Sequence, residues 1–140
     1  MKKRILVSVL LILSMLLCFA SCNKADDVEE GIWDDAAYHE DAELGNGNVV
    51  FYFQVKVADK SVTFTIHTDK EILGDALIEH SLIDGEQGAY GLYVKKVIGI
   101  TADYDKDGHY WSLESNGEML MTGVDSTPIV NGTHYEFVYT

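Results

Sequence analysis

The sequence Gly-Leu-Tyr-Val-Lys-Lys-Val at residues 91–97 decides the fold, because it begins a series of strands and turns that fills the last third of the chain. Its alternating apolar and β-branched residues predict a strand over 92–98. Similar patterns predict further strands at residues 110–115, 118–121 and 135–139. Asn116-Gly117 predicts a tight hairpin, and Asn131-Gly132 predicts a turn before the last strand. This part of the protein is therefore expected to be rich in β-structure.

Upstream of this series, the sequence predicts a hairpin followed by a short helix. Residues 48–57 and 61–68 are both rich in β-branched and aromatic side chains, and Ala58-Asp59-Lys60 can only be the turn between them. The run from Thr68 to Glu71 has the spacing of a helix capping box. Apolar residues on one stripe then predict an amphipathic helix that ends within residues 80–83, before a glycine-marked loop at 88–91.

The order of these elements predicts an α+β fold. Two strands, one helix and several further strands describe a short helix packed on a mixed or antiparallel sheet, which is the β-grasp or ubiquitin-like arrangement. The chain has no internal repeats. Its length beyond the leader suffices for one domain with a real core, but not for two.

The first residues predict an exported lipoprotein. Three basic residues precede an apolar run at 5–19 that is too short to serve comfortably as a final membrane anchor, so residues 1–21 are expected to be a signal peptide. The small residues Ala20 and Ser21 before Cys22 fit the cleavage site of a bacterial lipoprotein, which would leave a lipid on Cys22. The alternative is an ordinary cleavage site with Cys22 merely downstream. The lipoprotein hypothesis places the protein outside the cytoplasm, anchored to the bacterial cell membrane through that lipid.

Composition narrows the range of partners. Cleavage would remove Cys18 and leave Cys22 as the only thiol, so no disulfide is expected within the mature chain. It would also lower the formal net charge from −13 to −16. Such a surface repels phosphate groups, and no nucleic acid partner is expected.

Residues 22–47 are predicted to be a flexible acidic tether. This segment carries nine acidic residues against one lysine, so it cannot bury enough apolar surface to order itself. Trp33 and Tyr38 interrupt the tether, and a loose docking contact is expected for both. The folded domain is therefore predicted to span 48–140.

One loop has the complete sequence pattern of a calcium site. Asp103, Asp105 and Asp107 precede Gly108, and Glu114 is the twelfth residue of the pattern. Carboxylates at this spacing could supply the oxygen ligands that calcium needs. However, the flanking segments are predicted strands, whereas an EF-hand requires helices. A solvated acidic loop is the favoured interpretation, so no metal is assigned and calcium stays a minor candidate.

No pattern of catalytic residues is recognisable. The five histidines lack zinc-type spacing, and the chain has neither a Gly-x-Ser-x-Gly elbow nor a glycine-rich phosphate loop. A non-catalytic protein without an assigned cofactor is therefore expected. Tyr110 and Trp111 could form an aromatic wall for a flat ligand, although a role in the core is favoured for this pair.

The strand series resembles a known family. The Tyr-Val-x-x-Val strand beginning at Tyr93, the Tyr110-Trp111 strand, and Gly123-Val124-Asp125 with Pro128 behind it are similar to the C-terminal domain of the cobalamin carriers intrinsic factor and transcobalamin. Single-domain bacterial proteins are built on the same domain. The resemblance covers about residues 49–139 and is strongest from residue 88 onward.

This resemblance implies a ligand site. In the animal carriers the domain covers one side of cobalamin, and the corresponding contacts here would come from Tyr90, Gly91 and Leu92 and from Leu120 and Met121. The chain lacks the large helical domain that forms the other half of the carriers' site. The expected function is capture of a small ligand for delivery to a membrane transporter, with cobalamin or another corrinoid as the candidate ligand. The alternative is a structural or adhesive surface module that recognises protein and is stabilised by calcium.

Overall fold

The computed structural model describes residues 31–140. The predicted signal peptide, residues 22–30 of the tether and the lipidation site Cys22 lie outside the described residues. The strands and helices of the described part are as follows: β1 (Ala42–Gly45), β2 (Val49–Val57), β3 (Lys60–Thr68), α3 (Leu73–Glu79), β4 (Ile83–Gly88), β5 (Gly91–Val97), β6 (Ile100–Thr101), α4 (Tyr104–Asp107), β7 (Trp111–Ser115), β8 (Glu118–Met119), the 3-10 helix η1 (Val124–Ser126) and β9 (His134–Tyr139). No helix in this range is long and apolar enough to cross a membrane.

A six-stranded mixed sheet forms the body of the protein, in the order β1-β3-β2-β9-β7-β8. Two of its pairings are parallel, β1 with β3 and β2 with β9, and the other three are antiparallel. A second sheet of three antiparallel strands has the order β4-β5-β6. Together with the short helix α3, these sheets confirm the predicted α+β class.

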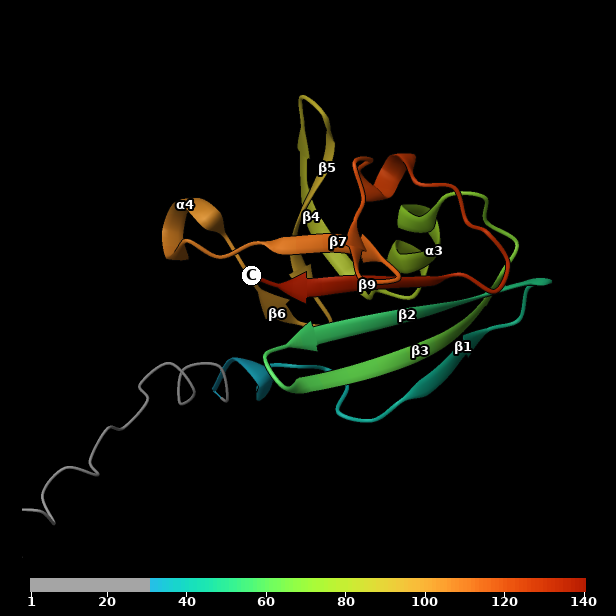
Figure 1. The fold of residues 1–140 in the computed structure, drawn as a ribbon, viewed down its shortest axis with the longest axis horizontal. Coiled ribbons are helices and arrows are strands. Elements are labelled where there is room, and N and C mark those ends of the chain that lie inside the picture. Colours follow the sequence, from blue (N-terminus) through green and yellow to red (C-terminus); the bar gives the residue numbers. More distant parts are fainter. Residues whose placement is uncertain (1–30) are drawn as a thin grey trace, which may run out of the picture.

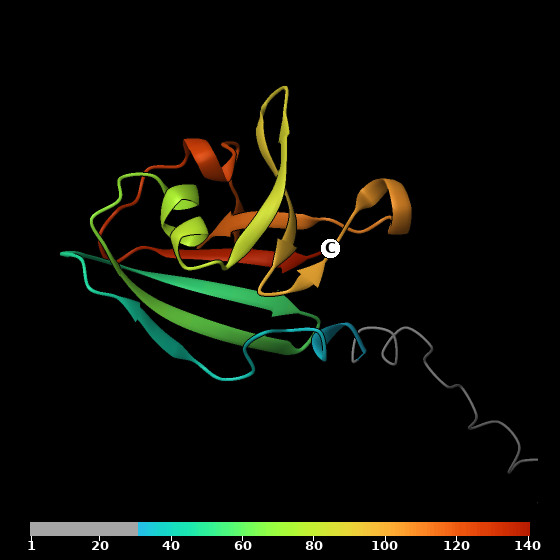
Figure 2. The same cartoon turned by 180° about the vertical axis from the view of Figure 1, so that it is seen from behind.

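The helix and the small sheet cover one face of the large sheet. Figures 1 and 2, which view the protein from opposite sides, show α3 and the β4–β5 hairpin on the same face, while the other face of the large sheet has no such cover. Alternation along β2 and β3 sends Phe51, Phe53, Phe64 and Ile66 to the covered face, where all four are fully buried. Phe53 packs on Phe64 and Phe137 with ring centroids 6.0 Å apart in each pair. The core therefore lies between the two layers.

The first hairpin is confirmed, and its turn is tighter than predicted. Residues of β2 and β3 pair from Val49 opposite Thr68 to Val57 opposite Lys60, which leaves Ala58 and Asp59 as the turn. The strands predicted near residues 92–98, 110–115, 118–121 and 135–139 are also present as β5, β7, β8 and β9, although β8 ends at Met119.

The predicted helix start was wrong. α3 begins at Leu73 with Ile72 as its N-cap residue, and no side chain caps it. Thr68 Oγ1 instead accepts a hydrogen bond from the backbone N–H of Lys70 at 3.0 Å, and the carbonyl of Glu71 accepts one from Ile129. Glu71 and Ile72 thus pair with the C-terminal segment near Pro128 and Ile129, and they are not part of the helix.

The second half of the predicted tether is part of the fold. Trp33 is only 7% exposed and belongs to the core, and the ring of Tyr38 packs edge-on against Phe64 at 4.9 Å. β1 extends the large sheet by pairing with β3. The prediction of a flexible tether up to residue 47 is therefore wrong for residues 31–47, because their few apolar side chains find partners that are distant in the sequence.

Candidate functional site

The most prominent projection of the protein is the β4–β5 hairpin, which rises from the body in Figure 1. Its tip presents Tyr90, which is fully exposed at 101%, and Tyr93 is also exposed along β5. Gly91 begins β5 with φ at +108°, a conformation that favours glycine. The strand β4 was missed because its sequence, Ile-Asp-Gly-Glu-Gln-Gly, has little β-propensity and is held mainly by pairing with β5.

A carboxylate connects this hairpin to η1. Oδ2 of Asp125 accepts a hydrogen bond from the backbone N–H of Leu92 at 2.9 Å. Oδ1 of Asp125 would lie only 2.6 Å from a Cβ on Gly91 and 3.1 Å from one on Gly123. The motif Gly123-Val124-Asp125 therefore has a physical role, since two glycines make room for the carboxylate that joins the two segments.

The two segments that the resemblance assigned to ligand contacts lie on one side of the protein, since a Cβ on Gly123, shortly after Met121, would lie 4.0 Å from the carbonyl oxygen of Tyr90. The chain before η1 lies beside the β4–β5 hairpin in both Figure 1 and Figure 2. Met121 is 96% exposed, and Met119 is 59% exposed. Leu120 between them is half-buried and packs against the core. We refer to Tyr90, Tyr93, Met119 and Met121 as the rim.

A small groove lies between β5, β7 and η1. Its volume is about 130 Å³, and its lining is largely apolar: Leu92, Tyr93, Val94, Trp111, Leu113, Gly123, Val124 and Phe137. Two polar atoms near it are buried without a hydrogen-bond partner, namely Trp111 Nε1 and Asp125 Oδ1. The groove could accept a substituent of a ligand but is smaller than a site for a whole cofactor.

Tyr110 and Trp111 have separate environments. Trp111 is 7% exposed and packs edge-on against Phe137 and Tyr139, so the favoured core interpretation applies to it. Tyr110 is half-buried and packs against Tyr104 of α4, with ring centroids 6.4 Å apart. The structure therefore brings Trp111 to the groove, whereas it places Tyr110 beside α4.

The predicted calcium pattern does not form one carboxylate cluster. Asp103 is buried and contacts Lys95 and Lys106 at 3.3 and 3.5 Å. Asp107 accepts hydrogen bonds from the backbone N–H groups of Asp103 and His109, and Asp105 is exposed. Glu114 lies on β7, opposite Glu136. Within residues 31–140, no three His, Cys, Asp or Glu side chains are arranged to hold a metal ion.

The contact between Asp103 and Lys95 shifts the pKa of both groups. Burial alone would raise the pKa of Asp103, but the hydrogen bond and the charge of Lys95, assisted by Lys106, outweigh it and lower that pKa. The pKa of Lys95 is raised, and its hydrogen bond to Glu86 at 3.0 Å is the largest cause. Asp103 raises this pKa further, whereas burial opposes both effects. Both groups are therefore stabilised in their charged forms.

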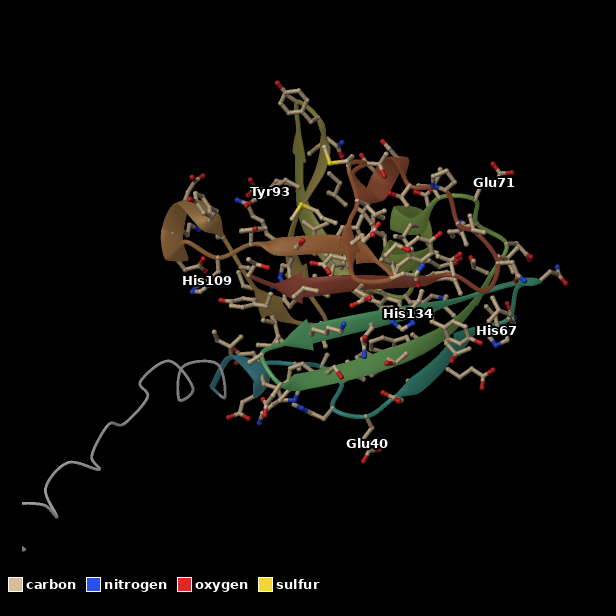
Figure 3. The ribbon with its side chains drawn as sticks, in the orientation of Figure 1. Glu40, His67, Glu71, Tyr93, His109 and His134 are labelled. Carbon is tan, nitrogen blue, oxygen red and sulfur yellow. The ribbon has the colours of Figure 1, made fainter. Side chains whose placement is uncertain are left out.

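A larger, polar cavity lies at the far end of β3. It has a volume of about 430 Å³ and is lined by Gly45, Asn46, Gly47, His67, Thr68, Asp69, Lys70, Glu79 and His80. Its approximate place is marked by His67 in Figure 3, where this residue is well separated from Tyr93 of the rim. Side chains at Gly45 or Gly47 would overlap the backbone of His67 or Thr68. Sequence reasoning missed this cavity, since only the Gly45-Asn46-Gly47 cluster indicated a special backbone there.

Known proteins share this architecture. A crystal structure of a candidate metal-binding protein from Ruminococcus gnavus ATCC 29149 is 32% identical to this chain with a TM-score of 0.62, and the match covers 66% of this chain and 97% of that one. Haptocorrin in complex with Cbi is 23% identical with a TM-score of 0.50, and the match covers 69% of this chain. No curated protein matches the chain.

These two matches differ in extent. This chain spans 27% of the haptocorrin chain, so most of that protein has no counterpart here, and the likeness shows the fold alone. Residues 71–140, half of the chain, match the family described as Domain of unknown function (DUF4430). This chain belongs to the DUF4430 family, and its fold is transcobalamin-like.

Proposed function

We propose that this protein is an extracytoplasmic lipoprotein that captures a small ligand of the corrinoid class at the rim, without catalysing a reaction. The observation that carries the proposal is the exposure of large apolar side chains, above all Tyr90 and Met121, on the tip of the β4–β5 hairpin and on the chain that leads into η1, which Asp125 joins to Leu92. These are the segments to which the resemblance assigns cobalamin contacts. The haptocorrin structure was solved with Cbi, which supports a corrinoid as the first ligand to test.

The dimensions of the groove suggest how such a ligand would be held. A volume of about 130 Å³ can take only a substituent, so the flat part of the ligand would lie across the rim. Tyrosine and methionine suit this contact because both offer apolar surface, and methionine adapts its shape. A rim that contacts one side of the ligand leaves the other side free for a membrane transporter to receive it.

Two further assignments belong to the same proposal. We infer a lipid on Cys22, supported by Ala20 and Ser21 before it, and mass spectrometry showing an unmodified mature Cys22 would contradict this. We also infer a fold of the β-grasp type, supported by the parallel pairing of β2 with β9 inside the large sheet.

The rim can be tested by titrating cobalamin and cobinamide into the purified protein. We expect the double variant Tyr90→Ala/Met121→Ala to bind at least about tenfold more weakly, as truncation of exposed anchor residues usually costs more than 1 kcal/mol. Its melting temperature should not change, because both side chains are exposed. Tyr104→Ala on α4 is the matched control, since it removes another exposed tyrosine away from the rim and should leave affinity unaltered.

Two outcomes would contradict the proposal. Absence of binding by any corrinoid at high micromolar concentration would exclude the ligand class, and the alternative of a protein-recognising surface module would then be favoured. Binding that is equally strong in the double variant would exclude the rim. Leu120→Asp is a poor test of the site, because Leu120 packs against the core and its substitution is expected to destabilise the fold.

A further inference from the structure

We propose that Met119 and Met121 form a surface site for a soft monovalent metal ion, Cu(I) or Ag(I). The feature that leads to this proposal is the direction of three consecutive side chains. Leu120 packs against the core, while Met119 and Met121 on either side of it are 59% and 96% exposed. Core packing therefore accounts for Leu120 but not for the two methionines.

Both methionines lie within one short segment that leaves β8. β8 ends at Met119, but the N–H of Leu120 still donates a hydrogen bond to the carbonyl of Leu113 at 2.9 Å. The Cα atoms of two residues separated by one other residue are at most about 7 Å apart, because each residue extends the chain by no more than about 3.4 Å. Two methionine side chains, each with three rotatable bonds, can bring their sulfur atoms together across this distance.

The chemistry of the thioether selects the ion. A thioether is a neutral, soft donor, which suits Cu(I) and Ag(I) but offers little to calcium or magnesium, whose preferred ligands are oxygens. Residues 31–140 contain no cysteine, so the sulfurs of Met119 and Met121 are the softest donors in the described part of the protein. The exposed carboxylate of Glu118 precedes them, and the acidic charge of the chain as a whole attracts cations.

A pair of conservative substitutions tests the contribution of the two sulfur atoms. In Met119→Leu/Met121→Leu both sulfurs are lost, but the volume and apolar character of the side chains are nearly kept. Loss of soft-metal binding in this variant would therefore report the loss of the sulfur atoms and not a change in side-chain volume. The metal proposal does not rest on the proposed function, and failure of one leaves the other intact.

The experiment is a titration of the purified protein with Ag(I), and with Cu(I) under reducing conditions, followed by calorimetry and by NMR of the methionine methyl groups. We expect one ion per protein, shifts of both methyl signals, and no detectable binding in the double leucine variant at an unchanged melting temperature. His39→Ala is the control for binding to an exposed imidazole and should behave as the unaltered protein. Unchanged stoichiometry in the double leucine variant, or loss of binding in His39→Ala, would overturn the proposal.

Discussion

At the scale of single residues, the contact between Asp125 and Gly91 joins η1 to the β4–β5 hairpin, which carries the two tyrosines of the rim. The carboxylate accepts a hydrogen bond from Leu92 and fills the space that a side chain at Gly91 would occupy. The motif Gly123-Val124-Asp125 was informative in the sequence because of a family resemblance. Its physical meaning depends on Gly91, which is 34 residues from Asp125 in the chain and could not be paired with it by pattern alone.

The first prediction concerns Gly91→Ala. This change forces a Cβ into a residue with φ of +108° and brings it within 2.6 Å of Asp125 Oδ1, so we expect the free energy of unfolding to fall by about 2 kcal/mol or more. Gly117→Ala is the matched control: φ there is +80°, but nothing lies within 4 Å of the new atom. Its cost should be about 1 kcal/mol. Urea unfolding measures the free energy of unfolding of both variants. An equal decrease in the two would show that the Asp125 carboxylate moves aside without loss of stability.

At the scale of elements, α4 occupies the segment that has the calcium pattern and for which a solvated acidic loop was favoured. Its single turn begins after Asp103 and ends at Gly108 in the left-handed conformation. The flanking segments are β6 and β7, so the carboxylates cannot converge as they do between two helices. Asp103 instead pairs with Lys95 of β5, which connects α4 to the small sheet.

The second prediction is an acid dependence of stability that arises from Asp103. A carboxyl group whose pKa is lowered by folding contributes stability above its unfolded pKa of about 4, and this contribution is lost as the pH falls through the lower folded value. We therefore expect Asp103→Asn to melt at a lower temperature than the unaltered protein at pH 7. The difference should shrink below about pH 4.

Asp105→Asn is the control for this measurement. Asp105 lies in the same turn and is exposed, so its substitution should leave the melting temperature almost unchanged at every pH. Thermal melts of the three proteins between neutral and strongly acidic pH provide the comparison. A difference between Asp103→Asn and the unaltered protein that is constant with pH would contradict the role of the ion pair.

At the scale of the whole molecule, the fold begins well before the predicted boundary at residue 48. The N–H of Ala37 donates to the carbonyl of Ile98 at 2.6 Å, and Trp33 is buried in the core. β1 covers the edge of β3, which would otherwise present unpaired backbone groups. The segment 31–47 is thus a structural part of the domain.

The third prediction compares two truncated proteins. A protein that begins at Asn48 loses β1 and the burial of Trp33, and we expect its free energy of unfolding to be lower by about 3 kcal/mol or more. A protein that begins at Gly31 is the reference, because the difference between the two isolates the contribution of residues 31–47. Urea denaturation distinguishes them, and equal midpoints would show that residues 31–47 contribute nothing to stability.

The sequence by itself determined most of the local structure. The β2–β3 hairpin, the helix near residue 77 and the strands β5, β7 and β9 follow from alternation, periodicity and turn residues, all of which act over a few positions. Such signals were strong enough to establish the α+β class. They could not predict β1 or β4, because these strands have weak propensity and depend on pairing with β3 and β5.

Only the tertiary structure decided which residues meet. It placed Trp111 in the core and Tyr110 beside α4, although the two are adjacent in the chain. It also joined Gly91 to Asp125 at the rim. The physical reason is that burial and side-chain hydrogen bonding depend on partners from distant parts of the chain, whereas a sequence pattern reports only what neighbouring residues favour.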